Sequence, residues 1–143
     1  MKTSSKARYA IYLVVDIARS QAAGPVRLRE IAERLDISVK YLEKIATELS
    51  KSGYLKSFRG AQGGYVLARS PEMISAGDIV RTAEGGFLPV ACLDGLAEGC
   101  PRQEHCCSTS VFWAGLMKAI DTYLDSVSIA QLAVPPKDLR HVG

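Results

Sequence analysis

The chain has 143 residues, of which 48% are hydrophobic and 23% charged, so it can bury one hydrophobic core and has the composition of an ordinary globular protein. No apolar run approaches the roughly 18 residues of a membrane-spanning helix, and we expect no membrane association. The net charge of +3 is uneven: residues 1–69 carry 13 Lys and Arg against 6 Asp and Glu (+7), and residues 70–143 carry 5 against 9 (−4). A basic first half indicates a polyanionic partner.

The N-terminal segment has charged residues on both sides of a short apolar stretch and lacks the small-residue cleavage site of a signal peptide. Its apolar residues recur at helical spacing, which predicts an amphipathic helix over residues 5–21. We therefore expect a cytoplasmic protein. In that reducing compartment, clustered thiols bind metal or perform redox chemistry more often than they form structural disulfides.

Two further helices follow with almost no connection between them. The first is predicted over residues 27–36, although Arg27 is a poor N-cap. The second begins after Ser38, a good N-cap, and ends near Gly53. The short link around Ile37 forces a sharp corner, which is the geometry of a helix-turn-helix whose second helix can enter a major groove about 12 Å wide.

The outward side chains of this second helix are the candidate DNA-reading residues. With the N-cap Ser38, they are Val39, Lys40, Tyr41, Glu43, Lys44 and Thr47. A carboxylate that faces DNA is costly unless it accepts a hydrogen bond from cytosine or repels wrong sequences, so we expect Glu43 to act in specificity. The simpler alternative is a solvated helix face with no ligand.

Two strand-like runs, YLKSF (54–58) and YVLA (65–68), come next and are separated by RGAQGG. The three glycines allow a tight hairpin whose backbone can approach a phosphate or enter the minor groove, with Arg59 and Gly60 at its tip. The loop lacks the spacing of nucleotide-binding motifs and no helix follows it. This order of elements predicts a mainly α fold containing a winged helix-turn-helix domain.

The second half begins with SAGD (75–78), a capping-box start for a helix that should end near Gly85. No periodicity follows until a long helix begins near Ser110. Its broad apolar stripe needs another surface, and we expect the same helix of a second subunit to provide it, because readers of palindromic DNA commonly form two-fold dimers. A short helical turn over 128–134 should stop at the two prolines that follow.

We therefore divide the chain into five parts. They are a winged helix-turn-helix domain (1–70), a connecting helix (71–90), a cysteine-rich loop (91–109), a dimerisation helix with a short terminal helix (110–134) and a polar tail (135–143).

The loop holds every cysteine of the chain: Cys92, Cys100, Cys106 and Cys107. The spacing contains no CxxC chelating pair, so structural zinc fits poorly. Iron–sulfur clusters are larger, and thiolates spread along a wrapped loop can reach their irons. Adjacent residues of an extended chain point in opposite directions, so we do not expect Cys106 and Cys107 both to bind one small cluster.

Residues 1–134 resemble the IscR/NsrR-type family of iron–sulfur cluster-binding winged-helix transcription regulators. The resemblance rests on TSSKARYAI, LREIAERLDISVKYLEKI, RGAQGGYVLA, ISAGDIVRTAEG, the cysteine loop and the Trp113-containing helix that leads to SIAQL. It implies a homodimeric bacterial regulator of operator DNA, tuned by a cluster lodged between the subunits. The DNA contacts that it implies are Ser38, Lys40, Tyr41, Glu43, Arg59 and Gly60.

The resemblance also implies three cysteine ligands: Cys92, Cys100 and either Cys106 or Cys107. IscR-type proteins have a histidine three residues after the last cysteine, whereas this chain has Thr109 or Ser110 there. Other relatives use an acidic residue near the N-terminus, where this chain has Arg8. The fourth ligand is therefore the remaining cysteine, His105 or a residue of the partner subunit, and the cluster can be 2Fe–2S or 4Fe–4S.

Two other functions are compatible with the cysteines. One is a cluster-free thiol switch in which Cys106 or Cys107 pairs with Cys100 on oxidation. The other is a small electron-transfer protein, which leaves the wing and the basic first half unexplained. The sequence contains no Ser/His/Asp or paired-carboxylate constellation, and we do not expect an enzyme.

Overall fold

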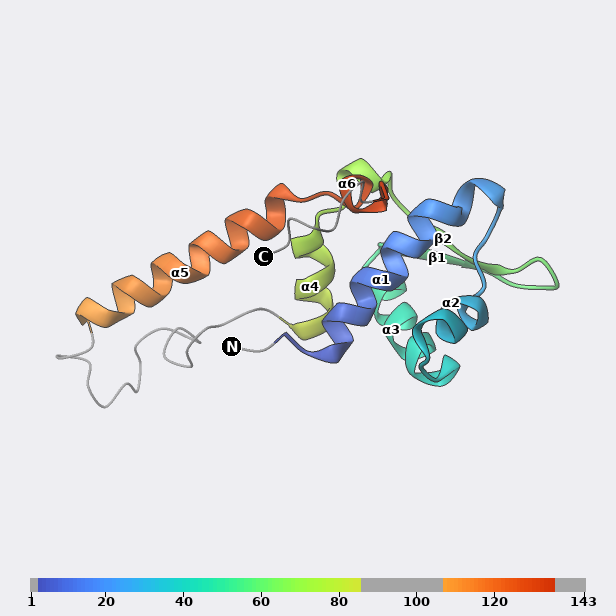
Figure 1. Ribbon diagram of the computed structural model, residues 1–143, viewed down its shortest axis with the longest axis horizontal. Helices are drawn as coiled ribbons and strands as arrows, with labels where there is room; N and C mark the ends of the chain where they lie inside the picture. The colour runs from blue at the N-terminus through green and yellow to red at the C-terminus, as the bar shows by residue number, and fades with distance from the viewer. Residues whose placement is uncertain (1–2, 86–106, 136–143) are drawn as a thin grey trace.

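The computed structural model describes residues 3–85 and 107–135 (Figure 1). The helices are α1 (Ser5–Ser20), α2 (Leu28–Leu35), α3 (Val39–Lys51), α4 (Ala76–Glu84), α5 (Cys107–Ser126) and α6 (Ile129–Ala133), with short 3₁₀ turns at Gln21–Ala23 and Pro71–Met73. The strands are β1 (Leu55–Phe58) and β2 (Gly64–Leu67). The predicted mainly α fold with a winged helix-turn-helix is confirmed.

The corner between α2 and α3 is as tight as the sequence predicts. Asp36 adopts a left-handed conformation with φ of 53°, which a short polar side chain tolerates, and the Ile37 amide donates back to the Ala32 carbonyl at 3.1 Å. The Ser38 hydroxyl then accepts a hydrogen bond from the Tyr41 amide at 3.1 Å, which starts α3.

The helix α2 begins one residue later than predicted. Arg27 occupies its N-cap position, but its side chain makes no capping hydrogen bond. The guanidinium donates instead to the Ala61 carbonyl in the hairpin loop. A contact over 34 residues of sequence thus replaces the local cap.

The wing is an antiparallel pair in which Leu55 lies opposite Leu67 and Phe58 lies opposite Gly64. A third segment joins it, because Val26 and Tyr65 exchange backbone hydrogen bonds of 2.9 and 2.8 Å. Gly64 makes this approach possible, since a Cβ there would lie only 2.6 Å from the Val26 carbonyl oxygen. The bridge fastens the wing to the segment that precedes α2.

The core does not end at residue 70. Buried residues of α1, α2 and α3 pack in one cluster with Ile74, Ile79 and Ala83 around α4 and with Ile129 of α6. The core of the winged helix-turn-helix domain therefore extends beyond its first three helices. The short α6, which we grouped with the expected dimerisation helix, lies against α1 and belongs to the same core as the winged helix-turn-helix.

The long helix α5 starts at Cys107, three residues before the predicted start. It extends away from the rest of the molecule (Figure 1). No residue between 109 and 126 is buried, and Val111, Phe112 and Tyr123 are 73%, 63% and 69% exposed. Within the described ranges, no helix has the length and apolar character to cross a membrane.

Candidate nucleic-acid interface

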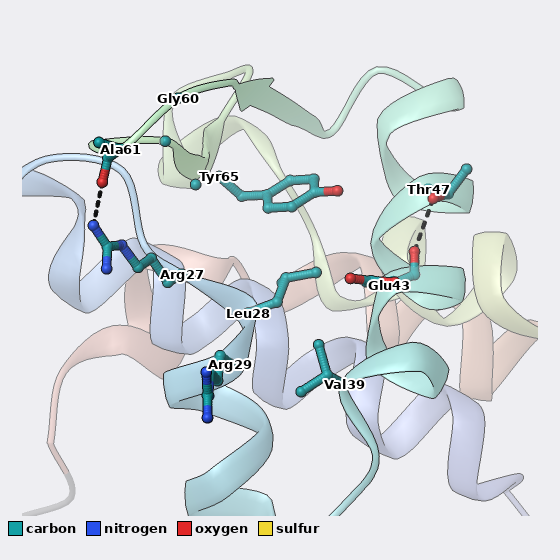
Figure 2. Close-up of a pocket in the computed structure, with 11 residues that line it drawn as sticks. Arg27, Leu28, Arg29, Val39, Glu43, Thr47, Gly60, Ala61 and Tyr65 are labelled. Carbon is teal, nitrogen blue, oxygen red and sulfur yellow. Dashed lines mark hydrogen bonds between the residues drawn. The ribbon is translucent and has the colours of Figure 1, made fainter.

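A groove of about 630 Å³ separates α3 from the wing (Figure 2). We call it the wing groove. Three segments line it: the start of α2, one face of α3 and the hairpin loop with β2. The lining residues are Arg27, Leu28, Arg29, Val39, Glu43, Thr47, Gly60, Ala61, Gly63, Gly64 and Tyr65.

The predicted DNA-reading residues divide into three groups. Val39, Glu43, Thr47 and Gly60 line the wing groove, and the Thr47 hydroxyl donates to the Glu43 carbonyl at 2.8 Å. Four others are exposed but do not line the groove, and these are Ser38, Lys40, Lys44 and Arg59. Tyr41 forms a group by itself, since it packs edge-on against Tyr9 of α1 at a ring separation of 6.1 Å.

The expectation that Val39 and Tyr41 face outward is only partly correct. Both are half-buried and pack against the core. Their positions on α3 are determined by where α1 and α2 lie, which the periodicity of α3 alone does not reveal. Tyr41 therefore helps to seat the start of α3 on α1.

The groove also contains residues that the sequence did not single out as site residues. They are Arg27, Arg29 and Tyr65. An arginine at a position where a capping residue is favoured was the available signal for Arg27. No sequence signal was available for Tyr65, because its position in the groove depends on how the two strands pair.

Tyr65 and Glu43 face each other across the groove. Figure 2 shows the Tyr65 ring reaching from the wing toward α3, on the side where Glu43 lies. Burial raises the pKa of the Tyr65 phenol, and the Glu43 carboxylate raises it further. The phenol therefore stays protonated at neutral pH and can donate a hydrogen bond to an acceptor in the groove.

Replacement of Arg27 by Ala is expected to loosen the wing tip without unfolding the domain. It removes the guanidinium that donates to Ala61 but leaves the Val26–Tyr65 bridge intact. The ¹⁵N heteronuclear NOE at Ala61 should fall, and the melting temperature should stay within about 2 °C of wild type. Arg29→Ala is the matched control, because Arg29 lines the same groove and pairs with Glu33. An equal loss of order in both variants would contradict the role of Arg27.

The predicted cluster ligands lie mostly outside the described residues. Cys92, Cys100, His105 and Cys106 fall between 86 and 106, and Cys107 is the first residue of α5. In the described part of the chain, no three His, Cys, Asp or Glu side chains lie close enough to hold a metal ion. The cysteine loop thus connects the end of α4 to the start of α5.

Comparisons with known proteins agree on one family. The Rrf2 family, described as "Iron-dependent Transcriptional regulator", matches residues 3–135. The HTH-type transcriptional regulator CymR of Bacillus subtilis is 37% identical over 93% of this chain and 90% of its own. A solved structure of B. subtilis CymR, described as the global cysteine regulator, has a TM-score of 0.78 at 34% identity and covers 93% of this chain and 96% of that one.

Two other similar proteins bear on the cysteines. The regulator IscR of Erwinia tasmaniensis is 35% identical over 92% of this chain and 78% of its own. The structure of the oxidized form of Staphylococcus aureus CymR has a TM-score of 0.76 at 33% identity, over 96% of this chain and 100% of that one. With a family match over nearly its whole length, the chain belongs to the Rrf2 family of transcriptional regulators.

Proposed function

We propose that the chain is a homodimeric transcription regulator of the bacterial cytoplasm that binds palindromic operator DNA. The helix α3 reads the major groove, the wing contacts the adjacent minor groove or backbone, and an iron–sulfur cluster in the cysteine loop tunes the affinity. The observation that carries this proposal is the wing groove, where basic and hydrogen-bonding groups from α2, α3 and the wing converge on one face.

The charges around the groove suit a phosphate backbone. Lys40 and Lys44 are exposed on the N-terminal half of α3, and Arg59 is exposed where β1 ends. Lysine and arginine provide most phosphate contacts, and they position a reader without specifying sequence. Glu43, inside the groove, is proposed to select sequence by accepting from cytosine or excluding other bases.

A second copy of the chain is the proposed partner of α5. This helix carries large apolar side chains, such as Phe112 and Tyr123, that are more than half exposed. An apolar helix face of that length indicates a protein contact. Two-fold pairing would present two α3 helices to the two halves of a palindrome.

The cysteines are the proposed ligands of the cluster. Four thiols within residues 92–107 suit a site for iron, and soft thiolates are the usual ligands of such clusters. Cys92 and Cys100 are assigned, with Cys106 or Cys107 as the third ligand. A bound cluster supplies redox sensitivity, and iron–sulfur status, redox state or nitric oxide is the proposed signal. Because the loop leads directly into α5, a rearrangement of the loop would shift the start of the proposed dimerisation helix.

A thiol switch is the second candidate. It is favoured by the likeness to CymR, one of whose structures is of an oxidized form. In this function Cys106 or Cys107 would form a disulfide with Cys100 and no iron would be needed. Mass spectrometry after peroxide treatment separates the two functions.

Removal of one proposed phosphate contact should change the salt dependence of DNA binding. For wild type, the logarithm of the association constant should fall linearly with the logarithm of salt concentration. Lys40→Ala and Lys44→Ala should each reduce the magnitude of that slope by about one. Fluorescence anisotropy with a labelled operator duplex at several salt concentrations measures it.

The control is Lys51→Ala, which removes an exposed lysine at the opposite end of the same helix. Its slope should equal that of wild type. A wild-type protein that shows no salt-dependent binding to duplex DNA would overturn the proposed function. If the slopes of all three variants equal that of wild type, Lys40 and Lys44 do not contact phosphate and α3 is not part of the interface.

A further inference from the structure

The C-terminal end of α5 is joined to the core by backbone hydrogen bonds. The Ala76 amide donates to the Val127 carbonyl at 2.7 Å, and the Ile129 amide donates to the Ile74 carbonyl at 2.8 Å. The Ile129 side chain is fully buried. These contacts secure one end of a 20-residue helix but do not by themselves determine its direction.

A second attachment lies within the last two turns of α5. Arg81 of α4 donates to Asp125, and its guanidinium lies 3.5 Å from the Asp121 carboxylate. Because Asp121 and Asp125 are four residues apart, they share one face of α5. Asp78, on α4 itself, completes the cluster at 3.8 Å from Arg81. One arginine thus holds two aspartates of the neighbouring helix, and we call this group the Arg81 clamp.

Gly77 permits the close approach that the clamp requires. A Cβ at this position would collide with the Asp125 carboxylate and would lie 2.8 Å from the Arg81 guanidinium. Both are ends of flexible side chains, so they could move aside, but only by leaving the clamp. Glycine at 77 and arginine at 81 therefore occupy one interface between α4 and α5.

The direction of α5 has large consequences at its far end. A 20-residue helix is about 30 Å long, so a rotation of about 10° at the clamp moves the far end by about 5 Å. This displacement exceeds the roughly 3.4 Å between successive base pairs. In a dimer built on α5, the same rotation would change the separation of the two α3 helices.

We propose that Arg81 is a positioning residue that, through Asp121 and Asp125, sets the direction of α5 relative to the DNA-reading domain and thereby the half-site spacing that the dimer recognises. This inference rests on the proposed dimeric DNA binding. The hydrogen bond that Arg81 donates to Asp125 raises the pKa of Arg81, so the arginine keeps its charge at all physiological pH values. The charge of Arg81 in the clamp therefore does not change with pH.

Arg81→Gln tests the inference with palindromic duplexes whose half-sites are moved apart or together by one and two base pairs. Wild type should prefer one spacing. In Arg81→Gln that preference over the neighbouring spacings should fall by about fivefold, which is within the range of coupling between contacting residues. Affinity for a duplex with a single half-site should stay within about twofold, because the wing groove is untouched.

Arg34→Gln is the matched control. It also removes an arginine–aspartate contact, with Asp16, but that contact joins α2 to α1 within the DNA-reading domain. Its spacing profile should match that of wild type. Asp125→Asn should reproduce the effect of Arg81→Gln, and the double variant should be no worse than Arg81→Gln alone, because both substitutions break one clamp.

A measurement without DNA reads the same geometry. A spin label attached through a non-natural amino acid at the exposed position Lys51 gives one distance between the protomers of a dimer. Gly77→Ala and Arg81→Gln should both broaden or shift this distance, and Arg34→Gln should not. If wild type binds DNA as a dimer but the Arg81→Gln profile and distance are unchanged, the inference alone is wrong. If wild type is monomeric or does not bind DNA, the proposed function fails and this inference fails with it.

Discussion

Truncation of Ile129 to alanine is expected to lower the free energy of unfolding by about 3 kcal/mol, since large-to-small changes in a core remove buried surface and leave a cavity. Ile129 is fully buried and is the one buried residue of α6 within the described chain. The Ile129 amide, which donates to the Ile74 carbonyl, is kept in the variant, so the effect reports the buried side chain alone. A domain of this size should then melt about 10 °C lower.

Thermal and urea unfolding at a fixed protomer concentration measure this effect, since the stability of a dimer depends on concentration. The control is Val134→Ala, which shortens an aliphatic side chain in the same segment that is 61% exposed. It should change the stability by less than about 0.5 kcal/mol. Equal shifts for the two variants would show that α6 is not part of the core.

Replacement of Cys92 by alanine is expected to abolish the visible absorbance of anaerobically purified protein. A cluster that loses one thiolate ligand is no longer held. The core of the described residues packs α1 to α4, the wing and α6 against one another. The circular dichroism spectrum and the dimer peak in size-exclusion chromatography should therefore persist. Iron and sulfide analysis beside the visible spectrum provides the measurement.

Single substitutions of Cys106 and Cys107 complete the experiment. These two cysteines compete for the third position. If only one of them binds iron, its variant should lose the colour and the other should keep it, whereas loss of colour in both would make the remaining cysteine the fourth ligand. If the Cys92→Ala variant stays coloured, the ligand assignment is wrong. If wild type holds no iron and forms a disulfide after peroxide treatment, the thiol switch replaces the cluster.

Much of the fold follows from local sequence signals. The periodicity of α1 and α3, the Ser38 cap and the capping box at Ser75 are all present as predicted, because each depends on residues only three or four apart. The wing follows from two short strand-like runs and their glycines. The same signals singled out Glu43 and Gly60, which both line the wing groove.

The contacts that decide how these elements work together needed the tertiary structure. Arg27 contacts Ala61 over 34 residues, Arg81 contacts Asp125 over 44, and Ile129 is buried among residues of the first half. Periodicity reports which face of a helix is apolar, but it carries no information about which distant segment covers that face. The sequence by itself determined the elements, the turn and the family resemblance. Only the fold decided that α6 completes the core and that Arg81 meets α5, because both depend on residues that are distant in sequence and meet only when the chain packs.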